Sequence, residues 1–252
     1  MPFFTPTCPV DEKSKKWIEG SFGWLLEEFG EDAFRNAEII RPDNKAFPEL
    51  IFAKEESIRE FLKAVCGFMD VKYETVVLEV FADQGKENFH PLATPDMEGS
   101  KACGLYYWYA GKNQIAIDQA LLRNPTTMVA TIAHELAHAK LRSDLVKDDK
   151  KDEEEFLTDL ATVFFGMGIF TANSVFSFDQ FTNAQFQGWR ASRQGYIDEE
   201  SAGYALALAS YLKGENKPIY AKYLETNPKY YYKKALKYLS KTGDCSLKPI
   251  KD

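Results

Sequence analysis

Histidine, paired cysteines and long apolar runs are scarce or missing in this chain of 252 residues. Its four cysteines lie far apart without a CxxC spacing, which argues against a cysteine-ligated zinc site. The longest apolar stretch, LATVFFGMGIF at 160–170, falls short of the roughly 20 residues that a membrane helix needs. The N-terminus shows no basic, apolar leader. We therefore predict a cytoplasmic protein with reduced thiols and no membrane span.

An excess of basic residues is also missing. The chain has 31 Lys and Arg against 38 Asp and Glu, a net charge of −7, and its basic residues are scattered along the sequence. An acidic surface repels phosphates, so we expect no nucleic acid as partner. Hydrophobic residues, at 45%, suffice for a core, and no repeat or linker divides the chain. We predict one α+β domain over 1–252, mainly helical at 1–73 and 171–252 around a core at 74–170.

Periodicity predicts the elements of that core. ETVVLEVFA at 74–82 is rich in β-branched residues and predicts a strand, and GLYYWYA and NQIAID predict a β-hairpin around Gly111 and Lys112. One helix is expected from Asn124–Pro125 to about residue 142 and a second over 152–170, with a loop after Thr171. Flanking helices are expected over 11–29, 55–69 and 198–214.

Two of the three histidines stand four residues apart in TIAHELAHAK at 131–140. Positions four apart on a helix differ by about 40° around the axis and about 6 Å along it, so His134 and His138 project side by side. Their ring nitrogens can converge on one ion at about 2.0–2.1 Å. Glu135 cannot bind from the same position but can reach a water on the ion. This pattern predicts two ligands and one general base rather than two satisfied core imidazoles.

A third ligand is expected from the next helix, in EEEFLTDLATVFFG at 153–166. Glu155 and Asp159 are again four residues apart on an otherwise apolar helix. A buried carboxylate needs a partner. A bound cation would be the partner of the Glu155 carboxylate. A histidine ring N–H would be the partner of Asp159, because zinc-bound histidines commonly donate their second ring N–H to a carboxylate.

HELAH followed by ExxxD resembles the gluzincin branch of the zincin-like metallopeptidases, over roughly residues 74–170. The wider pattern also resembles uncharacterised bacterial proteins with the same HELAH helix. The resemblance implies a zincin-like fold, with a small mixed or antiparallel sheet, an active-site helix and a buried second ligand helix. It implies Glu155 as third ligand, Asp159 as the carboxylate behind a histidine, and NQIAID as the edge strand that pairs with an extended substrate.

The chain departs from the gluzincin pattern in one respect. Only sixteen residues separate His138 from Glu155, which leaves Asp159 or Glu154 open as the ligand. Peptide hydrolysis also needs a donor for the oxyanion, and gluzincins use a histidine or tyrosine from a distant segment. We favour Tyr196 or Tyr204 for this role, with His90 as a further candidate.

These residues predict a zinc-dependent hydrolase, a peptidase or amidase with one Zn²⁺ per chain and a peptide or protein substrate. Glu135 would be the base that takes the proton of water. The alternative is a metal-stabilised interaction module, or a catalytically silent zincin-like protein. The presence of Glu135 favours the hydrolase, because a purely structural site needs no base, and structural zinc sites are usually closed and cysteine-rich.

Overall fold

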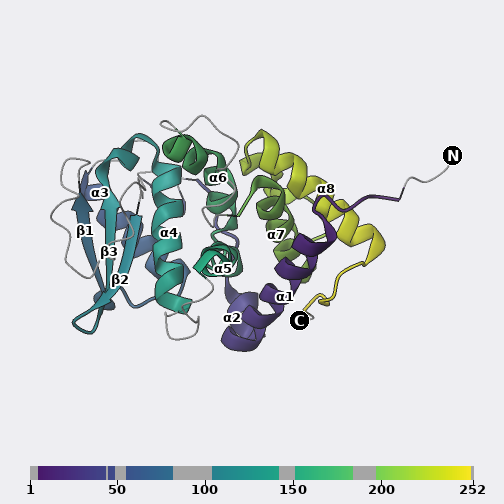
Figure 1. Ribbon diagram of the computed structural model, residues 1–252, viewed down its shortest axis with the longest axis horizontal. Coiled ribbons are helices and arrows are strands. Elements are labelled where there is room, and N and C mark those ends of the chain that lie inside the picture. The colour runs from purple at the N-terminus through teal and green to yellow at the C-terminus, as the bar shows by residue number, and fades with distance from the viewer. Residues whose placement is uncertain are drawn as a thin grey trace.

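The computed structural model describes residues 5–43, 45–48, 55–81, 104–141, 151–183 and 197–250 (Figure 1). This part of the chain is mostly helical, with a small sheet. Its helices are α1 (Glu12–Phe29), α2 (Glu31–Asn36), α3 (Glu55–Phe68), α4 (Pro125–Leu141), α5 (Lys151–Phe164), α6 (Gly168–Asn183), α7 (Glu199–Leu212) and α8 (Thr226–Thr242). The strands are β1 (Val76–Phe81), β2 (Gly104–Tyr109) and β3 (Lys112–Asp118), and short 3-10 turns are η1 (Tyr73–Thr75), η4 (Gln119–Arg123) and η6 (Ile219–Tyr223).

The three strands form a mixed sheet in the order β1-β3-β2. β3 pairs in parallel with β1 and antiparallel with β2. The predicted hairpin is confirmed: its turn is Ala110–Gly111, with φ of 50° and 77°, the left-handed values that suit a two-residue hairpin loop. The expectation that NQIAID forms an edge strand is wrong, because β3 has a strand on each side. β1 and β2 are the outer strands of the described sheet.

Helix α4 lies between the sheet and helices α5, α6 and α7 (Figure 1). It begins at Pro125. The side chain of Asn124, the preceding residue, caps the helix by accepting a hydrogen bond from the Thr127 amide at 3.2 Å. It contacts β2 and β3 and also α3, α5 and α6, so almost all of its side chains are buried. Ala133 and Ala137 let these neighbours approach closely. The histidines of α4 therefore lie inside the protein.

The chain bends sharply after α5, where one continuous helix over 152–170 was predicted. Gly166 has φ 89°, and a Cβ there would lie 2.1 Å from the carbonyl oxygen of Glu38. The carbonyl of Gly166 accepts a hydrogen bond from the Ile40 amide at 2.8 Å. A glycine is thus needed for the close approach, and α5 and α6 are separate helices. The loop predicted after Thr171 is also wrong, because α6 runs on to Asn183.

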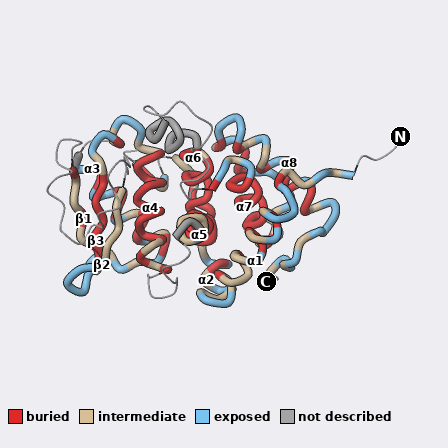
Figure 2. Tube along the Cα trace, viewed as in Figure 1, coloured by how far each residue is buried: buried red, intermediate tan, exposed pale blue. Residues whose placement is uncertain are grey.

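Buried side chains from all parts of the described chain join one hydrophobic core. Figure 2 shows the burial concentrated along α4 and α7, and α8 packs on α7. Among the described residues, no helix has both the length and the apolar composition to cross a membrane.

Candidate metal centre

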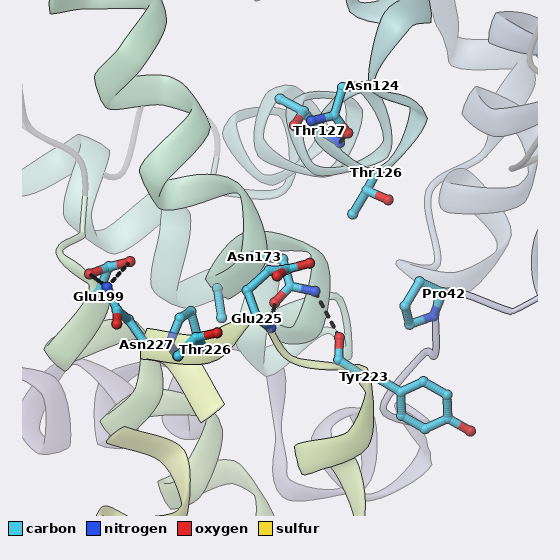
Figure 3. A pocket seen from close by; sticks show the side chains of 12 residues that line it. Pro42, Asn124, Thr126, Thr127, Asn173, Glu199, Tyr223, Glu225, Thr226 and Asn227 are labelled. Carbon is cyan, nitrogen blue, oxygen red and sulfur yellow. Dashed lines mark hydrogen bonds between the residues drawn. The ribbon is translucent and has the colours of Figure 1, made fainter. Parts of the chain in front are cut away.

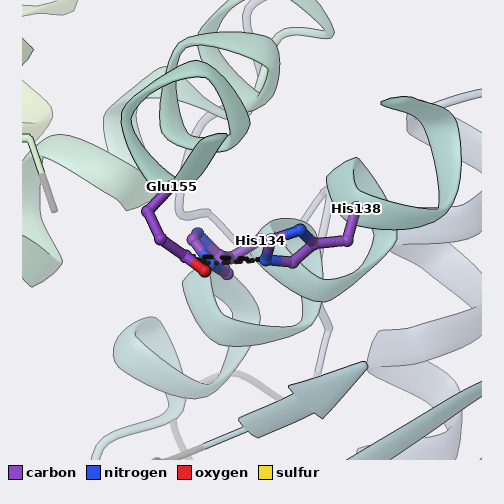
Figure 4. Close-up of side chains that lie close together, drawn as sticks. All are labelled: His134, His138 and Glu155. Carbon is purple, nitrogen blue, oxygen red and sulfur yellow. Dashed lines mark hydrogen bonds and ion pairs between the residues drawn. The ribbon is translucent and has the colours of Figure 1, made fainter. Parts of the chain in front are cut away.

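The two histidines of α4 turn their Nε2 atoms toward each other (Figure 4). His134 Nε2 and His138 Nε2 are 3.2 Å apart, and the two rings are inclined by 82°. His134 is buried and His138 is mostly buried. The one-turn spacing of the motif thus brings two ligand nitrogens together within the protein, as the sequence predicts.

Helix α5 brings Glu155 to the same point (Figure 4). Its Oε2 lies 3.0 Å from His134 Nε2 and 3.6 Å from His138 Nε2, and these three residues form a group that could hold a metal ion. In a tetrahedral zinc site with bonds of about 2.0–2.1 Å, ligand atoms lie about 3.3–3.4 Å apart. The three separations between these atoms, 3.0, 3.2 and 3.6 Å, lie on either side of that value. The donor atoms therefore fit one face of a zinc tetrahedron.

Asp159 lies one turn further along α5, behind His134. Its Oδ1 is 2.8 Å from His134 Nδ1, and its Oδ2 accepts a hydrogen bond from the Ile197 amide at 3.0 Å. Both carboxylate oxygens of Asp159 therefore have hydrogen-bond partners other than the two Nε2 atoms. Of the carboxylates left open as third ligand, Glu155 is the one that reaches both Nε2 atoms, while Asp159 orients a ring.

The charges of this centre stabilise one another. Burial would lower the pKa of His134, but the carboxylates of Asp159 and Glu155 outweigh it and raise that pKa well above its usual value. Burial would raise the pKa of Glu155, but the two histidine rings outweigh this and hold it well below the usual value.

Glu135 is buried beside this centre and is not one of its ligands. Burial raises its pKa, although the neighbouring His134 and His138 rings oppose this. The start of β2 passes directly over its carboxylate: a Cβ on Gly104 would lie 2.6 Å from Glu135 Oε1 and 2.6 Å from Thr131 Cγ2. A side chain at this position would have to displace the Glu135 carboxylate or Thr131, so Gly104 leaves the carboxylate the space that it occupies.

Thr158, which lies on α5 beside Asp159, was not among the site residues predicted from the sequence. Its hydroxyl is fully buried and 3.4 Å from His138 Nδ1, and it donates to the Glu154 carbonyl at 2.9 Å. Its position three residues after Glu155 was the available signal, because residues three and four apart share a helix face. On the other side of His138, the ring of Tyr106 is nearly parallel, with centroids 5.9 Å apart.

The predicted oxyanion donors have different outcomes. Tyr204 is completely buried, and its hydroxyl donates its single proton to Glu19 Oε1 at 2.6 Å. This bond joins α7 to α1 and leaves Tyr204 no proton for a substrate, so the role predicted for it gains no support. Tyr196 and His90 lie outside the described residues. The role of Tyr196 stays a prediction, next in sequence to the Ile197 amide that contacts Asp159.

A cavity of about 560 Å³ lies elsewhere, where α4, α7 and α8 begin (Figure 3). Its lining is largely polar and includes Thr127, Asn173, Glu199 and Glu225. Thr127 precedes His134 by seven residues, about 10 Å along the helix axis. None of the residues predicted for the metal centre lines this cavity.

Comparison with known proteins yields no match to a family model, to a curated protein or to a solved structure. The function of the chain is therefore argued from the geometry and chemistry of the centre formed by His134, His138 and Glu155.

Proposed function

We propose that this protein is a zinc-dependent hydrolase of the zincin-like, gluzincin type, acting on a peptide or amide bond. The observation that carries the proposal is the convergence of His134 Nε2, His138 Nε2 and Glu155 Oε2, with separations of 3.0 to 3.6 Å. Three protein ligands leave a fourth position of a tetrahedron for water or substrate, which is the pattern of catalytic zinc sites.

The donor set suits zinc. Two imidazole nitrogens and one carboxylate oxygen are borderline ligands that favour zinc over calcium or magnesium, whose sites are built from oxygen. A zinc ion held there would supply a Lewis acid that polarises a carbonyl group and makes water a better nucleophile at neutral pH. His134 and His138 would bind it through Nε2, and Asp159 would keep the His134 ring in place through Nδ1.

Glu135 supports hydrolysis over a purely structural role. It lies next to His134 in sequence, is buried, and is absent from the ligand group. As a carboxylate with a raised pKa it can take a proton from water and later pass it to the leaving amine. A structural zinc site has no need of a buried carboxylate beside its ligands, so this residue separates the hydrolase from an interaction module.

An extended substrate would lie along β2 rather than β3. The sequence assigned the substrate edge to NQIAID, but both edges of β3 are paired. β2 pairs with β3 on one side, and no strand of the described chain pairs with its other side. It also starts over Glu135, at Gly104, and passes His138, at Tyr106. Its main chain is therefore the one beside the proposed catalytic residues.

The test compares Glu135→Gln with the wild type and with Glu60→Gln, the same change at an exposed position of α3. Cleavage of a peptide library is followed by mass spectrometry at matched zinc content. Glu135→Gln should keep the zinc and lose about 10²–10⁴-fold in rate, because the amide cannot act as a base. Glu60→Gln should match the wild type.

Three results would count against the proposal. Equal cleavage by the wild type and Glu135→Gln would show that the cleavage uses another site. Stoichiometric zinc without cleavage by either protein would favour the interaction module. If the chain takes up no zinc after the metal is added, both the zinc hydrolase and the metal-stabilised interaction module are excluded.

A further inference from the structure

We propose that Thr158 is a positioning residue for the metal, holding the His138 ring with its proton on Nδ1 and its Nε2 lone pair directed at the ion. This inference rests on the proposed zinc centre and adds a residue that the HExxH and ExxxD patterns do not contain. Its basis is the geometry of the contacts among His138, Glu154 and Thr158.

The metal side of the His138 ring is its Nε2 atom. Nε2 lies 3.2 Å from His134 Nε2 and 3.6 Å from Glu155 Oε2, so it faces the proposed ion together with the other two ligand atoms. A metal bound at Nε2 uses the lone pair of that nitrogen, and a neutral imidazole then carries its proton on Nδ1.

The Nδ1 proton of His138 then needs an acceptor. Thr158 Oγ1 is 3.4 Å away, at the long end of the hydrogen-bond range, and it has already donated its own proton to the Glu154 carbonyl at 2.9 Å. A hydroxyl with its proton committed can only accept. Thr158 therefore favours the one tautomer of His138 that leaves Nε2 free for a metal.

One face of α5 thereby holds both imidazoles. Glu155, Thr158 and Asp159 occupy positions i, i+3 and i+4, which lie together on a helix. Glu155 reaches both Nε2 atoms, Asp159 reaches Nδ1 of His134, and Thr158 reaches Nδ1 of His138. Each histidine thus has its own partner on Nδ1, a carboxylate for His134 and a hydroxyl for His138.

Glu154 is the rival partner for His138. Its Oε1 lies 4.0 Å from His138 Nδ1, beyond hydrogen-bond distance. Thr158 is closer and fully buried, whereas the Glu154 side chain is about one third exposed, at 30%. A variant of each residue can therefore assign the role.

The test measures zinc affinity by competition with a chromophoric chelator in the full chain. Thr158→Val removes the acceptor at nearly constant volume, and Thr158→Ser restores it. Thr171→Val is the matched control, since it removes a buried hydroxyl from α6 that bonds Met167 and Thr162. Partners of zinc-bound histidines are worth about 10–100-fold in metal affinity, so we expect Thr158→Val to weaken zinc binding at least tenfold.

A second measurement reports the tautomer directly. The chain has three histidines, so ¹⁵N-labelled imidazoles give a spectrum simple enough to assign with His138→Gln. Metal-free wild type and Thr158→Ser should show the Nδ1–H form at His138, and Thr158→Val should show a mixture. Thr171→Val should match the wild type in both measurements.

The outcomes separate this inference from the proposed function. Zinc binding by the wild type with equal affinity in Thr158→Val would overturn the role of Thr158 and leave the metal centre standing. A tenfold loss in Glu154→Gln but not in Thr158→Val would assign the role to Glu154 instead. Absence of zinc binding by the wild type would remove the proposed function itself.

Discussion

Asp159→Asn is the substitution whose result the structure specifies most closely. Asp159 accepts two hydrogen bonds, one on each oxygen, from His134 Nδ1 at 2.8 Å and from the Ile197 amide at 3.0 Å. The side chain is buried. Asparagine fits the same space but offers one oxygen and one NH₂ group, so it can accept only one of these bonds and must present a donor to the other.

Each orientation of the amide has a different cost. With its oxygen on His134, the NH₂ group faces the Ile197 amide, and two buried donors without acceptors should lower the free energy of unfolding by about 1–3 kcal/mol. At about 2–4 °C per kcal/mol, that lowers Tm by several degrees. With its NH₂ on His134, Nδ1 must be unprotonated, so the proton moves to Nε2, the atom proposed to bind zinc.

The assay therefore measures two quantities in the same samples. Denaturant unfolding of chelator-treated protein gives the free energy of unfolding, and chelator competition gives zinc affinity. We expect a loss of about 1–3 kcal/mol in the first, a weakening of about 10–100-fold in the second, or both. Asp32→Asn, in an exposed pair with Arg35, should change neither. An Asp159→Asn protein with wild-type values of both quantities would refute the assignment of Asp159.

Chelator-treated protein should be most stable between about pH 4.5 and 6.5. The stabilisation that goes with the raised pKa of His134 is fully present below the unfolded pKa and is lost as pH rises through the folded pKa, whereas the stabilisation that goes with the lowered pKa of Glu155 is lost as pH falls. Tm measured across pH would show this, and a Tm that falls on neither side of the window would contradict it. Gly104→Ala places a Cβ 2.6 Å from Glu135 Oε1, so cleavage should fall while zinc content is kept, and unchanged kinetics would argue against the role of the glycine. Tyr204→Phe should lower the free energy of unfolding by about 1–3 kcal/mol without weakening zinc binding, because it removes a buried hydrogen bond, and calorimetry with zinc titration checks both.

The sequence predicts the grouping of His134, His138, Glu155 and Asp159 because each pair lies within one helix. His134 and His138 are one turn apart on α4, and Glu155 and Asp159 are one turn apart on α5, so the 3.6-residue period places each pair correctly. Thr158 escaped notice because a threonine in an apolar helix is common. Its contact with His138 depends on how α4 and α5 pack, which no local pattern specifies.

The errors in the fold have the same origin. The central position of β3 depends on its pairing with β1, more than thirty residues earlier in the sequence, and local alternation cannot reveal it. The segment after Thr171 has a loop-like composition, but it continues α6, which packs against α4 and α7, and Ala172, Ser174 and Val175 are buried. Tertiary burial there outweighs weak local propensity. Gly166, which lies inside the helix predicted over 152–170, was an available signal for the break before α6.

The short link between the motifs, which left the third ligand open, is consistent with the packing of the two helices. α4 and α5 are in contact, and the end of α4 at Leu141 is only ten residues before Lys151, where α5 begins. Glu155 therefore lies in the first turns of α5, opposite His134 and His138, and Asp159 lies one turn beyond it. The centre is one turn of α5 against one turn of α4, each about 6 Å long. Sliding α5 by a full turn would place Asp159 at the Nε2 atoms and remove the partner from His134 Nδ1, so the contact between Asp159 and the Ile197 amide, just ahead of α7, helps fix which carboxylate lies beside the Nε2 atoms.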